Sequence, residues 1–194
     1  MVRLNITIVL AILCAVVTVF SWFLGAEQIF DVFGYSTSNL LSGNIYVLVT
    51  SVFLHSSVEH LVLNLLVMLL FGFALEEEIG SKKLLLLFFF GAFFGDLLSS
   101  LFYSATTISV GASGGIYSII AATLLIKPIK MEVFLPIPLG IFALGYLLSS
   151  IIGLLIGYPP NVSHIAHIGG AFVGLFYGFK VKGFRKGLRI LIGI

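Results

Sequence analysis

Six long apolar runs divide this sequence, and they constrain its fold more than any other feature. A helix needs about 20 apolar residues to cross roughly 30 Å of hydrocarbon, and somewhat fewer where neighbouring helices bury it. The run at 112–126 is short and rich in glycine and serine, which favours a place inside a bundle. The sequence therefore predicts an all-α, polytopic membrane fold, a bundle of six transmembrane helices at about 4–24, 57–75, 84–103, 112–126, 133–156 and 164–179.

The composition agrees with a membrane protein. Hydrophobic residues make up 60% of the 194 positions and charged residues only 9%, whereas a soluble domain carries about a quarter of charged residues. The outer surface must therefore face mainly the lipid bilayer. Because no linker or low-complexity segment interrupts the chain, we expect residues 1–194 to form a single membrane domain. The net charge of +2 is too small to suggest nucleic acid as a partner, and the lone Cys14 cannot form an intrachain disulfide.

Charged residues occupy every second break between the runs. Lysines and glutamates at 76–83 and 127–132 and a basic tail at 180–194 alternate with uncharged breaks near 103–111 and 157–163. In a six-span chain all 10 Lys and Arg residues, Arg3 included, then lie on one side. Cytoplasmic loops carry the excess of Lys and Arg. We therefore expect a multi-pass protein of the cell membrane with both termini in the cytoplasm.

The connection at 25–56 is too long for a plain turn. It carries Glu27 and Asp31 together with aromatic residues such as Phe33 and Tyr35. Aromatic side chains are enriched at membrane–water interfaces, which favours a partly embedded loop. An ordered loop outside the membrane is the alternative interpretation.

Polar side chains gather at the outer ends of three predicted spans. Such groups are costly at membrane depth and usually mark a functional site or a structural hydrogen bond. They are His55, His60 and Asn64 at the second span, Ser113 at the fourth, and His164 and His167 at the sixth.

These residues supply the groups that acyl transfer needs. The hydroxyl of Ser113 becomes a useful nucleophile only if a base takes its proton, and an imidazole such as His167 suits that role near neutral pH. Asn64, His60 and the backbone N–H of Ser113 can donate hydrogen bonds to the negative oxygen of a tetrahedral intermediate. No Asp or Glu is placed to orient His167 as in a triad. Tyr117, one turn from Ser113, is expected to pack against the imidazole instead.

Glycines on the fourth and sixth spans indicate how the serine and the histidine could meet. Small residues at four-residue spacing let transmembrane helices approach closely, and we expect this contact to hold Ser113 and His167 within hydrogen-bond range. The glycines are Gly170, Gly174 and Gly178 on the sixth span, and Gly111, Gly114 and Gly115 around Ser113.

At this point the sequence resembles the rhomboid family of intramembrane serine proteases. Gly111-Ala-Ser113-Gly resembles the family's G-x-S-G nucleophile motif, with Tyr117 at the expected offset, and residues 166–170 resemble its catalytic-histidine helix. His55, His60 and Asn64 reproduce its H-x4-H-x3-N pattern, and Glu78-Ile-Gly80-Ser resembles its glutamate–glycine turn after the second span. The resemblance covers residues 45–179 and is that of a minimal six-span prokaryotic form.

The resemblance implies an activity and a division of roles. Ser113 and His167 would form a catalytic dyad that passes through an acyl-enzyme, while His60 and Asn64, supported by Tyr117 and Gly111, would help to build the oxyanion hole. It implies single-span membrane proteins as substrates, admitted past the fifth span and the 157–163 cap, and it implies no cofactor and no metal. Many members carry Trp-Arg in the first loop where this chain has Tyr46-Val47, which leaves the anchoring contacts of that loop open.

Other functions remain to be compared with this one. Gly111 to Gly115 also fits the G-x-S-x-G elbow of soluble hydrolases, but that motif needs a strand–turn–helix that the sequence lacks. Four histidines suggest a metal site, yet no carboxylate or thiolate is placed to join them. An inactive relative that binds transmembrane helices is the main alternative, and a transport protein would need paired repeats that are not apparent. For Asp96 in the third span, we expect a hydrogen bond to a serine or a helix end rather than chemistry.

Overall fold

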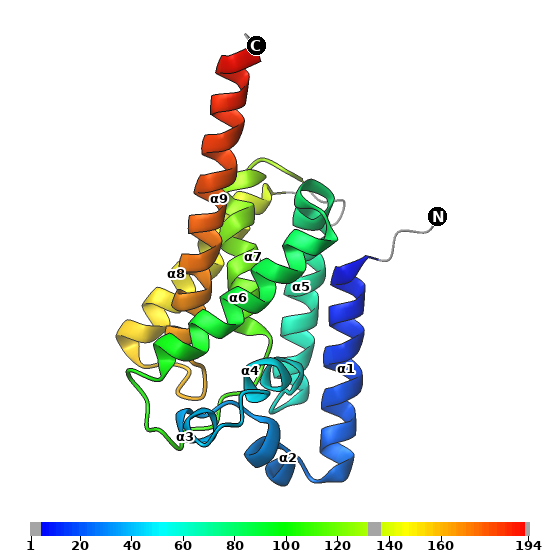
Figure 1. Cartoon of the computed structure of the whole chain (residues 1–194), viewed down its shortest axis with the longest axis vertical. Coiled ribbons are helices and arrows are strands. Elements are labelled where there is room, and N and C mark those ends of the chain that lie inside the picture. Colours follow the sequence, from blue (N-terminus) through cyan, green and yellow to red (C-terminus); the bar gives the residue numbers. More distant parts are fainter. Residues whose placement is uncertain (1–4, 132–136, 193–194) are drawn as a thin grey trace.

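The computed structural model of this chain describes residues 5–131 and 137–192, with side chains described up to residue 183. Within these ranges every regular element is a helix (Figure 1). They are α1 (Ile6–Leu24), α2 (Ala26–Phe33), α3 (Thr37–Leu41), α4 (Val47–Thr50), a short 3-10 helix η1 (Ser51–Phe53), α5 (Val58–Ile79), α6 (Ser81–Ser99), α7 (Ser113–Ile126), α8 (Leu139–Ile156) and α9 (His164–Ile192). The all-α prediction is confirmed.

Helix α7 forms the centre of the bundle. It packs against α5, α6, α8 and α9, and every residue from Gly114 to Thr123 is buried. Its small residues allow this because the flanking backbones can approach without meeting large side chains. The expectation that the short 112–126 segment lies inside the bundle is confirmed.

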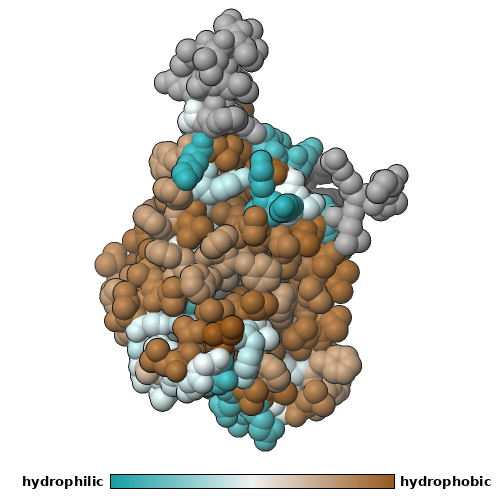
Figure 2. All heavy atoms as spheres, viewed as in Figure 1, coloured by the Kyte–Doolittle hydropathy of each residue, from teal (hydrophilic) through white to brown (hydrophobic). Residues whose placement is uncertain are grey.

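The outside of the bundle is apolar. Three of the described helices, α1, α5 and α8, are long and apolar enough to cross a membrane, and α7 is a shorter apolar helix. Large side chains such as Phe20, Phe23 and Leu155 are mostly exposed on α1 and α8. Figure 2 shows a brown, apolar band around the middle of the molecule with hydrophilic groups near both ends. Such a surface is expected of a chain whose solvent is hydrocarbon.

The predicted spans 4–24 and 112–126 agree closely with α1 and α7, and the other four differ from the prediction. Helix α5 continues to Ile79 rather than ending at 75. Helix α6 covers Ser81–Ser99 rather than 84–103. Helix α9 continues to Ile192, so residues 180–192 of the predicted tail are helical. Helix α8 begins at Leu139 directly after Pro138, a residue whose fixed φ suits a helix start. The earlier start predicted at residue 133 lies outside the described residues.

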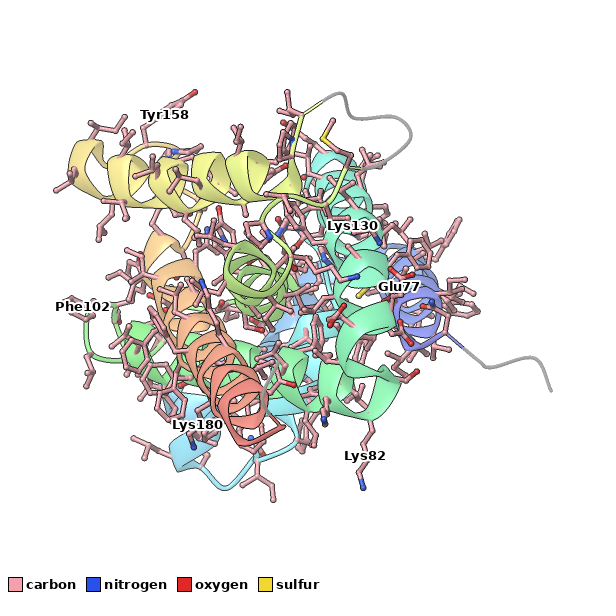
Figure 3. All side chains as sticks on the ribbon, turned by 90° about the horizontal axis from the view of Figure 1, so that it is seen from above. Glu77, Lys82, Phe102, Lys130, Tyr158 and Lys180 are labelled. Atoms are coloured by element: carbon pink, nitrogen blue, oxygen red, sulfur yellow. The ribbon has the colours of Figure 1, made fainter. Side chains whose placement is uncertain are left out.

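Charged side chains meet at the end of the bundle where α1 begins and α9 ends. Lys127 forms a salt bridge of 2.9 Å with Glu78, and Lys130 forms one of 2.8 Å with Glu77, as Figure 3 shows for Glu77 and Lys130. The breaks at 76–83 and 127–132 therefore share one end, as the charge pattern predicts. The predicted positions of Arg3, Glu132 and the side chains of Arg185, Lys186 and Arg189 lie outside the described residues.

Glu76, near the end of α5, connects the start of α1 and the start of α6 by hydrogen bonds. Its carboxylate accepts hydrogen bonds from the backbone N–H groups of Ile6 (2.7 Å) and Thr7 (3.0 Å) and from the hydroxyls of Thr7 and Ser81, both at 2.6 Å. The sequence motif quoted above used Glu78 instead, which faces Lys127. Because three glutamates are consecutive, the sequence alone did not show which of them makes these hydrogen bonds. The packing of α5 shows that it is Glu76.

The connection at 25–56 is folded into short helices rather than extended as a loop. Its backbone is tied to the 103–111 connection by paired hydrogen bonds between Tyr35 and Ser109, of 3.0 and 2.7 Å. Thr50 donates a hydrogen bond of 2.6 Å to the carbonyl of Phe33, and Tyr46 lies against the ring of Phe33 at 6.0 Å. This connection covers the end of the bundle where α7 and α9 begin (Figure 1).

Candidate active site

A cavity of about 740 Å³ opens among α5, α6, α7, α9 and the connections at their outer ends. It gathers the site residues that the sequence predicts: Ser113, His167, Asn64, His60, Tyr117 and Gly111 all line it. Five of them come from three helices that are distant in sequence, and Gly111 lies in the turn before α7. Their convergence on one cavity is the main structural result for the site.

Ser113 is the first residue of α7 and is partly exposed in this cavity. The chain turns into the helix at Gly111, whose φ of 129° is a conformation that favours glycine. A methyl group at Gly111 would also meet the ring of His60. Two backbone donors fix this turn: Gly111 N–H to the carbonyl of Ser51 (3.0 Å) and Ala112 N–H to Nε2 of His55 (3.4 Å).

His167 lies in the first turns of α9 and is only 9% exposed. Its ring stacks on that of Tyr117, with centroids 4.1 Å apart and planes inclined by 10°. The predicted packing of Tyr117 against the imidazole is therefore confirmed. Its Nδ1 lies 2.9 Å from the hydroxyl of Ser150 in α8.

The structure does not join Ser113 and His167 directly. Both line the same cavity, but among the described residues the Ser113 hydroxyl has no hydrogen bond, so the predicted hydrogen-bond contact is not formed here. Because Nδ1 is used by Ser150, Nε2 is the ring nitrogen left for a group in the cavity. Hydrogen bonds of this kind are often long in substrate-free enzymes and tighten when substrate binds.

The predicted glycine contact between α7 and α9 is confirmed. A methyl group on Gly170 would overlap the carbonyl of Gly114, one on Gly174 would overlap the carbonyl of Ser118, and one on Gly178 would crowd Leu125. Glycine spacing on α9 therefore sets how closely the helix carrying His167 approaches the helix carrying Ser113. Gly115, in contrast, faces α6, where it packs on Phe88.

His60 and Asn64 form the opposite wall, on α5. The amide Nδ2 of Asn64 donates 2.8 Å to the carbonyl of His60, and Nδ1 of His60 lies 3.2 Å from the hydroxyl of Ser56. The Asn64 amide keeps a second N–H, and His60 keeps Nε2, for a group bound in the cavity. Hydrogen bonds at the start of α5 therefore orient both side chains, while the second N–H of Asn64 and Nε2 of His60 remain available to a group in the cavity.

His55 and His164 make structural hydrogen bonds. Nδ1 of His55 lies 3.0 Å from the hydroxyl of Thr18 in α1, while its Nε2 accepts the bond from Ala112. Burial, and after it the neighbouring His60, lowers the pKa of His55 to about 3. The ring is therefore neutral and free to accept that bond. His164 approaches the carbonyl of Tyr158 at 3.1 Å and fixes the cap before α9.

Asp96 and Ser150 are the residues that sequence reasoning did not resolve. Asp96 lines the cavity and is 8% exposed, yet among the described residues its carboxyl has no hydrogen bond, contrary to the expectation. Ser150 was missed, although a serine pair in the apolar run of α8 was a signal of a polar contact. Within the described part of the chain no three His, Cys, Asp or Glu side chains are grouped to hold a metal ion.

Comparisons with known proteins agree with the resemblance seen in the sequence. The family model described as Rhomboid domain matches residues 42–184. RHOMBOID-like protein 1 of Arabidopsis thaliana is 34% identical over 132 residues, which are 68% of this chain and 33% of that relative. RHOMBOID-like protein 12, mitochondrial, of the same plant is 30% identical over 170 residues, 76% of this chain and 49% of the relative.

A relative from another kingdom gives a similar match. Rhomboid-like protease 3 of Toxoplasma gondii is 30% identical over 150 residues, which are 74% of this chain and 56% of that protein. The chain thus spans between a third and somewhat more than half the length of these relatives.

Proposed function

The chain belongs to the rhomboid family, and on this premise we propose that it is an intramembrane serine endopeptidase that cleaves transmembrane segments of membrane proteins. Members of this family are generally intramembrane serine proteases, and one relative is named a protease. The observation that carries the proposal is the shared cavity: it holds Ser113 together with a buried imidazole whose Nδ1 is already bonded and whose Nε2 is not.

In the proposed reaction, the Ser113 hydroxyl attacks the carbonyl carbon of the scissile peptide while Nε2 of His167 takes its proton. The tetrahedral intermediate carries negative charge on the former carbonyl oxygen. The Asn64 amide, His60 and the backbone N–H of Ser113 are the donors for that oxygen. Collapse expels the amine, which takes the proton from His167, and leaves an acyl-enzyme. Water activated by His167 then hydrolyses the ester and restores Ser113.

We propose a single membrane domain over 1–194 in which α1, α5, α6, α7, α8 and α9 are six spans. Support comes from the charged side chains that meet at the end where α1 begins and α9 ends. Lys82 lies in the first turn of α6, which begins at the same end (Figure 1), and Lys180 lies in the second half of α9. By the positive-inside rule this end faces the cytoplasm, and so do both termini. The cavity then opens toward the outer face of the cell membrane, where water can reach it for deacylation.

The substrates that fit this proposal are single-span membrane proteins that enter from the lipid. The most exposed helix beside the cavity is α8, whose residues Ile141, Ile152 and Leu155 face outward. Together with the 157–163 cap, α8 is the proposed entrance. The proposal involves no metal or cofactor, because serine and histidine supply both nucleophile and base.

Labelling with a fluorophosphonate serine probe tests the proposal without knowledge of the substrate. The purified chain should label in lipid, whereas Ser113→Ala and His167→Ala should not. A matched control is Ser21→Ala, because Ser21 bonds only the Thr18 carbonyl of its own helix, α1. Absence of labelling in the parent, in detergent and in lipid, would instead favour a proteolytically inactive relative that binds transmembrane helices.

A further inference from the structure

Ser150 connects the proposed base to a chain of hydrogen bonds. It lies in α8, is 2% exposed, and its hydroxyl is 2.9 Å from Nδ1 of His167 and 2.7 Å from the hydroxyl of Tyr117. The hydroxyl of Tyr117 in turn donates a hydrogen bond of 3.3 Å to the backbone carbonyl of Tyr146. Three helices therefore meet in one line of hydrogen bonds.

The direction of every bond in this line follows from its last member. A carbonyl oxygen can only accept, so Tyr117 must donate its proton to Tyr146. The Tyr117 oxygen then accepts the proton of Ser150. With its own proton used in this way, Ser150 can only accept from His167, which places a proton on Nδ1. The other nitrogen, Nε2, is left with its lone pair, which is the form a general base requires.

We infer that Ser150 is a positioning residue that sets the tautomer of His167 in place of the missing triad carboxylate. The inference rests on the proposed function and adds a third member to its dyad. A serine oxygen is a neutral acceptor, so it orients the ring and stabilises the imidazolium less than a carboxylate does. Because Ser150 belongs to α8, this control lasts only while α8 stays packed against α7 and α9.

Three variants test this role. Ser150→Ala removes the acceptor and Ser150→Thr keeps a hydroxyl at the same place. Ser21→Ala, the control, changes a buried serine of α1 that bonds only within its own helix. The rate and pH profile of fluorophosphonate labelling are measured for each. We expect Ser150→Ala to slow labelling roughly tenfold, the rate equivalent of losing one hydrogen bond of about 1.4 kcal/mol. Ser150→Thr should recover most of this rate, and Ser21→Ala should match the parent.

A second readout separates this inference from the proposed function. Nitrogen-15 NMR of histidine-labelled protein, with His167→Gln to assign the signal, reports which ring nitrogen of His167 carries the proton. The Nδ1–H form should dominate in the parent and be lost in Ser150→Ala, whether or not the protein reacts with the probe. An unchanged tautomer together with an unchanged labelling profile in Ser150→Ala would overturn the inference.

A separate observation concerns Asp96, which is the one carboxyl deep in the cavity. It lies one turn from Ala92 on the face of α6 that lines the cavity, and the adjacent Gly95 packs on the backbone of Ala166 beside His167. A carboxyl that is 8% exposed and has no hydrogen-bond partner among the described residues is costly to bury. Ionisable residues at membrane depth usually face a substrate path and have a specific partner there.

The charges around the cavity identify the class of that partner. Glu59 stands with Asp96 among the lining residues, and none of those residues is a Lys or Arg. The described basic side chains lie instead at the charged turns around Lys82 and Lys130 and in the second half of α9, where Figure 3 labels Lys180. We propose that Asp96 receives a lysine or arginine side chain of the substrate segment. This proposal also depends on the proposed protease activity.

Single-span reporter substrates test the preference. Each carries Lys, Gln or Glu at one position, scanned along the residues that flank the cleavage site, and is offered to the parent, to Asp96→Asn and to the control Glu77→Gln, which neutralises an exposed carboxylate away from the cavity. We expect one position where the parent cleaves the Lys reporter about tenfold faster than the Gln reporter. Asp96→Asn should bring the two rates together, and Glu77→Gln should retain the difference. Cleavage of all reporters at one rate would overturn the subsite alone, whereas cleavage of none would overturn the protease proposal as well.

Discussion

Gly114 in α7 and Gly170 in α9 touch so closely that a methyl group at position 170 would overlap the carbonyl oxygen of Gly114. The residues beside this contact are the proposed nucleophile, Ser113, one position before Gly114, and the proposed base, His167, one turn before Gly170. The spacing between the two backbones therefore sets the spacing of the two proposed catalytic groups. Any side chain at position 170 must push α9 away from α7.

Gly170→Ala is expected to weaken both stability and activity. Overpacking of this kind costs about 1–3 kcal/mol, and the forced separation should abolish most probe labelling even in protein that remains folded. Gly183→Ala, on the same helix with nothing within 4 Å of its added methyl, is the matched control. Thermal unfolding in detergent and labelling rate are measured together. Normal labelling by Gly170→Ala would show that the contact does not set the site geometry.

Tyr117→Phe separates the ring of Tyr117 from its hydroxyl. Phenylalanine keeps the stacking on His167 but removes the acceptor of the Ser150 proton, so Ser150 can turn that proton toward Nδ1 and favour the wrong tautomer. Loss of one hydrogen bond of about 1 kcal/mol corresponds to roughly fivefold slower labelling. Tyr117→Leu, which also removes the ring, should lower the rate further. Equal rates for Tyr117→Phe and the parent would argue against the tautomer mechanism.

Thr18→Val should disturb the site from a distance. Thr18 in α1 lies 3.0 Å from Nδ1 of His55, and His55 accepts the N–H of Ala112 next to Ser113. Valine leaves the buried imidazole N–H without an acceptor, which costs about 1–3 kcal/mol of stability. Ser21→Ala is the control, because Ser21 bonds only the Thr18 carbonyl in its own helix. The thermal midpoint should fall for Thr18→Val and change little for Ser21→Ala.

The sequence predicted best those helices whose ends are marked by capping residues or by glycine turns. Helix α1 ends at Gly25 with φ of 101° and is capped by Asn5, and α7 begins in the glycine turn before Ser113. Each of these helix boundaries is set by residues that are only a few positions apart, so the sequence itself shows them. The spacing of Gly170, Gly174 and Gly178 likewise identified the contact face of α9, because residues at four-residue spacing share one side of a helix.

Contacts that depend on the rotation of a helix could not be predicted. Ser149 and Ser150 are adjacent in an apolar run, and only packing shows that Ser150 turns toward His167 while Ser149 stays exposed. The same ambiguity applies to Glu76 and Glu78, of which only Glu76 turns toward α1. Neighbouring positions on a helix point about 100° apart, so a small error in rotation exchanges a buried residue for an exposed one.

Glu76→Gln provides a test of that last assignment. The carboxylate accepts hydrogen bonds from Ile6, Thr7 and Ser81, and a glutamine would turn an amide N–H₂ toward groups that are themselves donors. Hydrogen bonds to a charged group contribute about 1.5–3 kcal/mol each, so we expect a loss of roughly 3 kcal/mol in unfolding free energy and early fraying of α1. Glu77→Gln is the control, since its side chain is 65% exposed and a surface pair contributes about 0–1 kcal/mol. Hydrogen exchange at Ile6 and Thr7, measured with thermal unfolding, distinguishes the two. Equal losses in both variants would mean that Glu76 does not fasten α1 to the bundle.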